Sequence, residues 1–206
     1  MAIVSLNSDL IEFENFDMSL QFGNIFVGLP NGFSRPIFRN SFSRIVRTNF
    51  IALTDEARSY LRGTIMVAGY ATDQVLFNLP REYTRYTGSA TETIRLRSDA
   101  TQGSNTIIVE NASDSSFPVS TDFYPGMHFN LEADNGSRLY TVDNYTPSTG
   151  TVVFAPYLHT SYDADTEFLY QDPYMLGNIV SSIDEGLLPY NFQFLRVPTI
   201  IQEYVV

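Results

Sequence analysis

Residues 123–154 read FYPGMHFNLEADNGSRLYTVDNYTPSTGTVVF, and this stretch decides the fold class. Apolar and polar residues alternate on both sides of Asp134-Asn135-Gly136, a pattern typical of two strands joined by a tight hairpin. Asn and Gly accept the positive φ that such a turn requires. A second turn at Ser148-Thr149-Gly150 leads into the apolar run 151–154. The stretch therefore predicts three consecutive short strands.

The same pattern extends on both sides, from residue 91 to residue 172. Further short strands are expected at 93–97, 106–110 and 166–170, again separated by polar turns. Five or six short strands with tight turns indicate a small barrel of the OB type or a small β-sandwich. We expect this segment to be a domain inserted in a loop of another domain.

The chain on either side of this segment supplies that other domain. The strands predicted there lie at 3–6, 20–26, 38–51, 75–79, 180–184 and 190–197, with a weaker one at 9–17 and an apolar end at 202–206. Pro30-Asn31-Gly32 marks a turn between two of them. The predicted fold class is mainly β: a β-sandwich domain with one helix, formed by residues 1–90 and 173–206, and an inserted small OB-like β-barrel, formed by residues 91–172.

One helix is expected at 54–68. Thr54 can cap it, and the acids that follow Thr54 suit the positive end of a helix dipole. Ala57, Tyr60 and Leu61 form an apolar face at helical spacing, while Gly63 favours an early end or a frayed last turn. This helix would support a sheet and carries no chemistry.

Composition narrows the function classes. The 206 residues include no Cys, which excludes disulfides, thiolate metal sites and a Cys nucleophile. No stretch resembles a signal peptide or is long and apolar enough to span a membrane, so we expect a protein made in the cytoplasm without membrane insertion.

All 12 basic residues are Arg, and the net charge is −11. Residues 1–97 carry 10 Arg and 9 acids, whereas residues 98–206 carry 2 Arg and 14 acids. An acidic half repels phosphate, and no dense basic run occurs, so nucleic-acid binding is not expected.

No pattern typical of catalysis occurs, so we expect a protein that is not an enzyme and has no cofactor, catalytic residues or metal site. His128 and His159 lie far apart in sequence and are expected to be surface or half-buried residues rather than ligands. Asp163, Asp165 and Glu167 would share one face of an extended run. Calcium binding is one interpretation of that face, and a solvated acidic edge is the favoured one.

Exposed tyrosines are the one feature with a possible binding role. Tyr83 and Tyr86 flank arginines, and Tyr157 and Tyr162 have acidic neighbours. Aromatic rings stack on sugars or fill interface pockets. Packing in the core or at an interface is the favoured interpretation of these tyrosines, and binding of a cell-surface saccharide is the alternative. Three glycosylation sequons begin at Asn111, Asn135 and Asn144, and are interpreted as loops rich in Asn and Ser.

The order of these pieces resembles the distal tail proteins of long-tailed phages. The resemblance covers most of the chain and is best at 88–172, although Met127 stands where the family often has Asp and the first 50 residues have no clear match. It depends on the helix 54–68, the strand that ends at Leu79-Pro80, the entry strand 93–97, and the motifs at 102–109, 124–129, 137–142 and 151–158.

The resemblance implies a virion structural protein without catalytic activity. Such a protein would form a homohexameric ring, a baseplate hub component at the viral tail tip that joins the tail tube to the tip or hub proteins. Its expected partners are copies of itself, the tail tube protein and the tail-tip proteins. The alternative function is a carbohydrate- or receptor-binding tail module that uses the barrel.

The charge division suggests where ring contacts would lie. In a ring, one face of a subunit meets a different face of the next, and opposite potentials help to align the two. The predicted interface combines arginines with the apolar strand residues among them: Arg39, Arg44, Arg47, Phe42 and Phe50. The phenylalanines would supply most of the buried area, since a single exposed ion pair contributes only about 0–1 kcal/mol.

Overall fold

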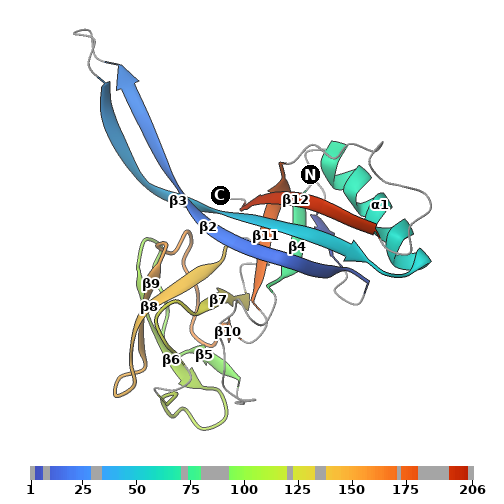
Figure 1. Ribbon diagram of the computed structural model, residues 1–206. Coiled ribbons are helices and arrows are strands. Elements are labelled where there is room, and N and C mark those ends of the chain that lie inside the picture. The colour runs from blue at the N-terminus through green and yellow to red at the C-terminus, as the bar shows by residue number, and fades with distance from the viewer. Residues whose placement is uncertain are drawn as a thin grey trace. The chain divides into compact units, whose positions relative to one another are not determined.

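The computed structural model describes residues 3–6, 10–28, 34–70, 74–79, 93–119, 123–132, 138–170, 173–180 and 195–203. The chain divides into two compact units, Met1–Val75 with Gly177–Val205 and Leu76–Leu176. The fold-class prediction is confirmed: the protein is mainly β, with a curled sheet, a closed six-stranded barrel and, among the described residues, one helix (Figure 1). The curled sheet is consistent with the predicted β-sandwich. The domain boundaries at residues 90 and 173 stay a prediction.

The sheet has six strands in the order β1-β4-β11-β12-β3-β2. Its strands are β1 (Ile3–Ser5), β2 (Glu12–Gly28), β3 (Ser34–Ala52), β4 (Gln74–Asn78), β11 (Tyr174–Ile179) and β12 (Leu195–Glu203). The last two strands thus lie between β4 and β3, so the end of the chain returns to the sheet that its beginning started. The prediction that a strand begins at Val180 is wrong, because β11 lies earlier in the chain and ends at Ile179. Residues 181–184 lie outside the described part.

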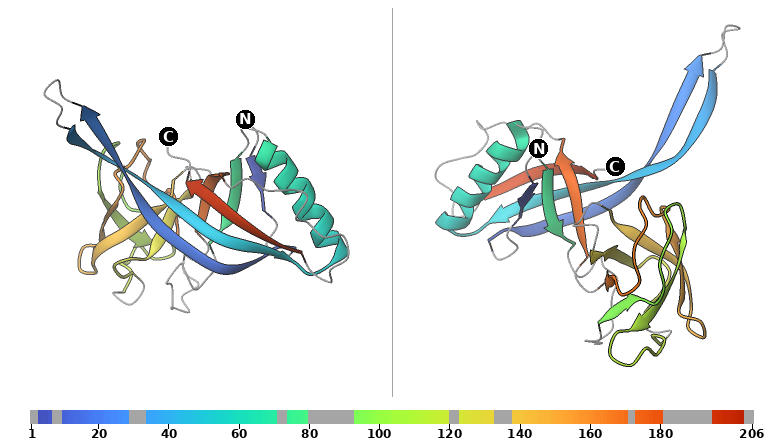
Figure 2. Two further views of the ribbon diagram at one scale, coloured as in Figure 1. Left: turned by 45° about the horizontal axis from the view of Figure 1, so that its top comes forward. Right: turned by 180° about the vertical axis from the view of Figure 1, so that it is seen from behind.

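β2 and β3 are much longer than their neighbours, at 17 and 19 residues. They pair with each other from Glu12↔Ile51 to Gly28↔Ser34, with register shifts after Glu14 and after Phe22. β12 pairs with β3 only as far as Gln202↔Ile45. Beyond that point the described strands form a two-stranded ribbon, residues 20–28 with 34–44, which we call the arm. The arm projects from its sheet in every view (Figure 2).

Helix α1 spans Asp55–Tyr70, close to its predicted range. The Thr54 hydroxyl accepts a 3.1 Å hydrogen bond from the Ala57 amide, which is the N-cap that the sequence predicts. Ala57 and Leu61 are buried, and the Tyr60 hydroxyl donates to the Ser5 carbonyl at 2.8 Å, which ties the helix to β1. The early end suggested by Gly63 does not occur.

The second unit contains the barrel. Six antiparallel strands close in the order β10-β5-β6-β9-β8-β7, because β10 pairs with both β5 and β7. This is one strand more than the five of a standard OB-fold. The strands are β5 (Ile94–Leu96), β6 (Thr106–Asn111), β7 (His128–Leu131), β8 (Tyr140–Thr146), β9 (Thr151–Ala155) and β10 (Glu167–Leu169). The hairpin turn predicted at 134–136 and the turn predicted at 30–32 lie outside the described residues.

Stacked aromatic rings fill the barrel. The ring of Phe129 stacks on that of Phe168, with 4.2 Å between centroids. The same Phe129 ring also stacks on that of Tyr140, with 5.3 Å between centroids. The alternation of Phe129 and Leu131 seen in the sequence therefore marks part of the barrel core, although His128 and Asn130 of the same strand are buried as well. A fully packed interior makes this barrel a solid body rather than a channel.

Asn130 connects the barrel to the chain that leaves it. Its amide nitrogen donates to the carbonyls of Arg138 and Tyr174, at 2.8 and 3.0 Å, and its amide oxygen accepts from the Tyr174 amide at 2.7 Å. The side chain is fully buried. The side chain of Asn130 thus makes the two hydrogen bonds to the Tyr174 backbone that a neighbouring strand would otherwise make.

A fragment of residues 91–176 should therefore fold more stably than a fragment of residues 91–172. The shorter fragment leaves the buried amide of Asn130 without the Tyr174 backbone, and each unsatisfied buried group costs about 1–3 kcal/mol. Denaturant unfolding of both fragments measures the difference. Equal stabilities would show that the Tyr174 contact does not stabilise the barrel, and two unfolded fragments would contradict a barrel that folds by itself.

Two glycines at positive φ differ in their surroundings. A Cβ on Gly150, at φ 64°, would lie 2.4 Å from the Val109 carbonyl oxygen and 2.5 Å from the Phe117 ring. A Cβ on Gly103, at φ 81°, would meet no atom within 4 Å. The two positions separate backbone strain from crowding.

Gly150→Ala should lower the free energy of unfolding of the barrel by about 2–5 kcal/mol, because strain and overpacking add. Gly103→Ala is the matched control, and strain alone predicts a loss of about 1–2 kcal/mol. Thermal and denaturant unfolding of the two variants beside the parent provide the comparison. Similar losses at both positions would mean that the neighbours of Gly150 yield to the added methyl group.

Candidate assembly surface

Two of the five residues predicted at a subunit interface lie in the interior. Arg44 is 1% exposed and pairs with Glu203, and Phe50 is 0% exposed and packs edge-on against Phe13, with 5.4 Å between ring centroids. A side chain enclosed by its own chain cannot contact a neighbouring subunit. The assignment of these two residues to an interface is therefore corrected.

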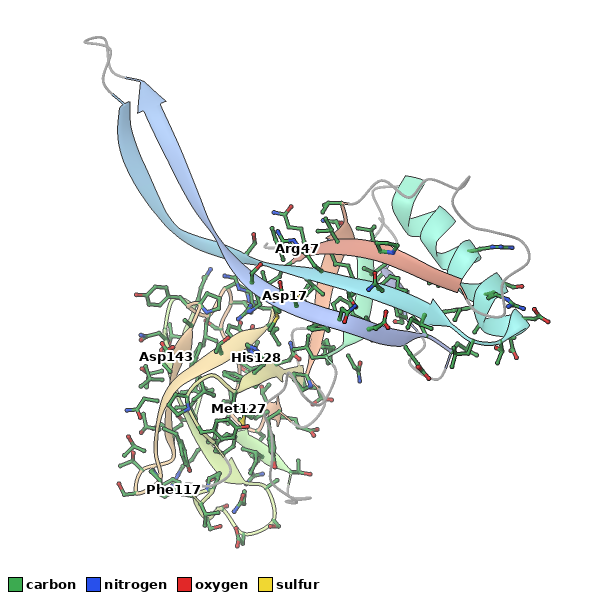
Figure 3. All side chains as sticks on the ribbon, viewed as in Figure 1. Asp17, Arg47, Phe117, Met127, His128 and Asp143 are labelled. Atoms are coloured by element: carbon green, nitrogen blue, oxygen red, sulfur yellow. The ribbon has the colours of Figure 1, made fainter. Side chains whose placement is uncertain are left out.

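Arg47 is the predicted interface residue whose side chain is described and exposed. It pairs across the ladder with Asp17, and its Nη1 donates to the Ser19 hydroxyl at 3.1 Å (Figure 3). Arg39 and Phe42 lie on β3 in the arm, and their side chains are outside the described part. The role of these three residues at an interface stays a prediction.

The ladder register assigns each arm residue to one of two faces. Residues that pair across antiparallel strands share a face, and every second residue along a strand shares it too. The step from Phe22↔Phe42 to Asn24↔Phe38 covers an even number of positions on both strands, so the assignment continues across the irregularity. One face, which we call the aromatic face, holds the positions of Leu20, Phe22, Phe26, Pro36, Phe38 and Phe42, together with those of Asn24, Gly28 and Ser34.

The aromatic face continues the buried face of the sheet. Along β3, Arg44, Val46 and Phe50 are buried and alternate with Ile45 and Arg47, which are more exposed. By the same alternation, Phe42 and Phe38 lie on the face of Arg44. The row of positions that forms the core of the sheet therefore extends along the arm, past the last described residue of β12.

The arm also has unpaired backbone edges. β2 is the last strand of the sheet order, so its outer edge has no partner among the described strands. Past Arg44, whose amide bonds to Glu203, no described strand pairs with the outer edge of β3. Unpaired edges of this length are templates for pairing with another chain, and most proteins keep them short, charged or covered.

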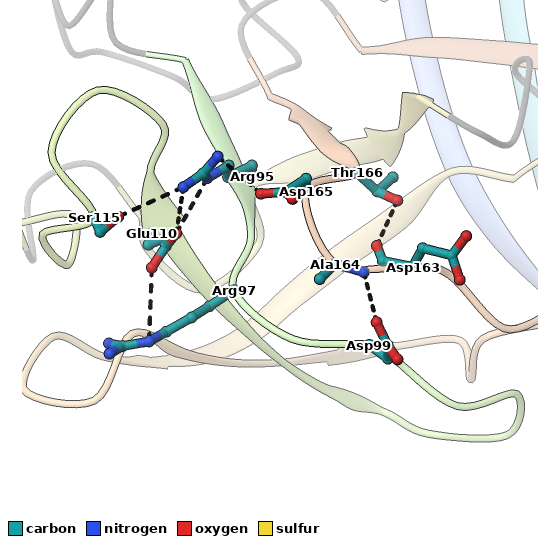
Figure 4. Close-up of polar contacts among 9 residues, drawn as sticks. All are labelled: Arg95, Arg97, Asp99, Glu110, Ser115, Asp163, Ala164, Asp165 and Thr166. Carbon is teal, nitrogen blue, oxygen red and sulfur yellow. Dashed lines mark hydrogen bonds and ion pairs between the residues drawn. The ribbon is translucent and has the colours of Figure 1, made fainter.

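The barrel contributes a charged surface. Glu110 accepts hydrogen bonds from Arg95 at 2.9 and 3.1 Å, and Arg97 Nε lies 3.6 Å from its other oxygen (Figure 4). Arg95 also pairs with Asp165 at 2.8 Å. The guanidinium carbon of Arg97 lies 4.8 Å from the centre of the Phe117 ring, a cation–π contact. Arg95 and Arg97 are thus paired with acids of the barrel itself.

The three acids considered for calcium do not form an extended face. Asp165 adopts φ 71° in a turn and pairs with Arg95, whereas the Asp163 carbonyl accepts from the Thr166 hydroxyl at 2.7 Å. Only Glu167 belongs to a strand. Within the described residues, no group of three or more His, Asp or Glu side chains is arranged to hold a metal ion.

The two histidines lie in the barrel and bond to different neighbours. His128 Nδ1 lies 3.0 Å from the Thr141 hydroxyl. His159 Nδ1 lies 3.2 and 3.3 Å from the hydroxyls of Tyr140 and Tyr162, which also approach each other at 3.2 Å. This closed triangle stabilises buried hydroxyls.

The tyrosines and sequons have different locations. Tyr157 is exposed, but Tyr162 is 3% exposed, so the prediction that Tyr162 lies at the surface is wrong. Tyr83 and Tyr86 lie outside the described residues. Asn111 is buried and its amide donates to the Ser116 hydroxyl, which excludes it as a glycan acceptor in the folded chain. Asn144 is exposed, and Asn135 is outside the described part.

No protein-family model matches the chain, and no curated protein matches it in sequence. Among the helices of the described part, none has the length and apolar character needed to cross a bilayer. Among the described strands, the arm is the part of the sheet with two outer backbone edges that no further strand pairs with.

The Glu110 cluster allows a direct test of the barrel surface. Glu110→Gln should lower the free energy of unfolding by about 1–3 kcal/mol, because it weakens charged hydrogen bonds at a largely buried site. Asp143→Asn is the control on an exposed strand position, with an expected change within about 0.5 kcal/mol. Denaturant unfolding measures both. A loss no larger than that of the control would mean that solvent screens the Glu110 contacts.

Proposed function

We propose that this protein is a non-enzymatic virion structural protein, a ring-forming distal tail or baseplate hub component that joins a phage tail tube to the tail tip. The observation that carries this proposal is the arm. An isolated two-stranded hairpin is only marginally stable in water, so an arm with an apolar sequence requires a surface to cover it. In a closed ring, every subunit offers such a surface to the next one.

The positions on the arm support a contact between subunits. The aromatic face holds four phenylalanine positions, and phenylalanine is enriched at the centres of protein interfaces. The other face holds the position of Arg35 beside Ile25, Val27 and Ile37. The second half of the chain carries the excess of acids, so a neighbouring copy offers opposite charge to the arm.

The family resemblance implies the location and the partners: a ring at the tail tip of the virion, after synthesis in the host cytoplasm, in contact with tail tube and hub proteins. The alternative, a carbohydrate- or receptor-binding tail module, has one observation in its favour: the Tyr157 ring is exposed on the barrel. One exposed ring gives little area on which a sugar can stack. It therefore supports the alternative function less than the arm supports a contact between subunits.

Phe22→Ser with Phe38→Ser should abolish the assembly while the chain stays folded. Both positions lie on the aromatic face, and polar residues there remove the apolar area that would be buried against the neighbouring subunit. Native mass spectrometry and light scattering at matched concentration measure the oligomer. The parent is expected to form a hexamer, and the variant a monomer.

The matched control is Ile25→Ser with Ile37→Ser, a pair on the opposite face of the same arm. It should weaken the oligomer less than the phenylalanine pair does. A parent that stays monomeric at every concentration and binds a polysaccharide in a Tyr157-dependent way would favour the alternative function. Equal effects of the two serine pairs would show that the aromatic face has no special role.

A further inference from the structure

A buried charged pair joins β3 to β12 where the arm begins. The last register pair between β12 and β3 is Gln202↔Ile45, and Glu203 and Arg44 are the next residues on the two strands. Glu203 Oε2 accepts a 2.9 Å hydrogen bond from the backbone amide of Arg44, and Oε1 accepts a 2.8 Å hydrogen bond from its Nη1. One carboxylate thus binds both the main chain and the charge of one residue. We call Arg44 and Glu203 the root pair.

The root pair is enclosed by the sheet. The side chains of Arg44 and Glu203 are 1% and 3% exposed. On its other side, Glu203 pairs with Gly177 of β11, where an added Cβ would lie 2.6 Å from the Ile201 side chain and 2.7 Å from the Gln202 carbonyl oxygen. The three positions form one row across β3, β12 and β11, and the glycine allows close approach. A charged pair in such a place tolerates little displacement, since moving one partner leaves the other buried and uncompensated.

The root pair lies where the arm begins. Its carboxylate binds the main chain of β3 as well as a side chain, so it resists separation of β3 from β12 at this point. The guanidinium on the same residue then fixes the carboxylate, because two bonds from one residue define its orientation.

We propose that the root pair is a lock that holds the arm in one direction and register. Glu203 is its positioning residue: the carboxylate binds the Arg44 amide, and the Arg44 guanidinium holds the carboxylate. An arm held this way is ordered before any partner arrives, so less conformational entropy is lost on docking. The proposal concerns the isolated chain and does not depend on the ring.

Native-state hydrogen exchange of Glu203→Gln tests the lock. The glutamine keeps the shape and one acceptor but loses the charge that Arg44 holds. Amides of the arm, residues 20–28 and 34–44, should exchange about tenfold faster or more than in the parent, while those of the barrel strand β6 keep their rates. Glu12→Gln is the matched control, an exposed acid on β2 of the same sheet, and should change neither set.

A second variant covers the case in which the single substitution unfolds the sheet. Arg44→Met with Glu203→Leu removes both charges together, and buried ion pairs often tolerate such apolar replacement. The sheet should stay folded, with arm exchange accelerated as in Glu203→Gln. The lock is overturned by arm protection equal to the parent in the double variant. It is also overturned by equal acceleration of arm and barrel amides, or by a parent whose arm amides already exchange at the free rate.

Discussion

The backbone ladder between β2 and β3 is the constraint on which the first unit depends. It fixes the register of two strands over more residues than any other pair, and β12 then adds to β3 in the register that the ladder allows. A shift of one residue would turn Val46 and Phe50 outward and bring Arg47 into the core. Both the core of the sheet and the faces of the arm therefore follow from one set of main-chain hydrogen bonds.

The two units manage strand edges in opposite ways. The barrel closes through β10, which pairs with β5 and with β7, so its strands have no free edge. The sheet stays open at β2, and the arm leaves even more backbone unpaired among the described strands. In a closed barrel, the backbone N–H and C=O groups of every strand pair within the chain. An open edge strand has unpaired groups that another strand can bind. Among the described strands, the unpaired backbone edges thus lie in the first unit.

Local signals in the sequence predicted much of this fold, and features that depend on distant strands were missed. Thr54 and Ala57 mark the helix start because a cap involves neighbours in the chain. The strand β11 was placed too late, since Gly177 and Asn178 interrupt its apolar pattern and their fit depends on β12. Arg44 and Phe50 were assigned to a surface because alternation shows which residues share a face but not which face is covered. The arm was missed for the same reason: alternation continues unchanged where a strand loses its neighbour.

The pairing of β5 with β10 has a consequence for evolution. Phe168 lies opposite Ile94, so the chain enters and leaves the barrel on adjacent strands, about 5 Å apart. Before and after the barrel, the Leu79 amide donates to the Pro173 carbonyl at 2.8 Å, so the two flanking segments also run side by side. A segment whose ends are this close behaves as a cassette. Recombination could exchange it for another domain with neighbouring termini and leave the sheet with a junction of the same span. Protein engineers could use the same junction to carry a foreign domain.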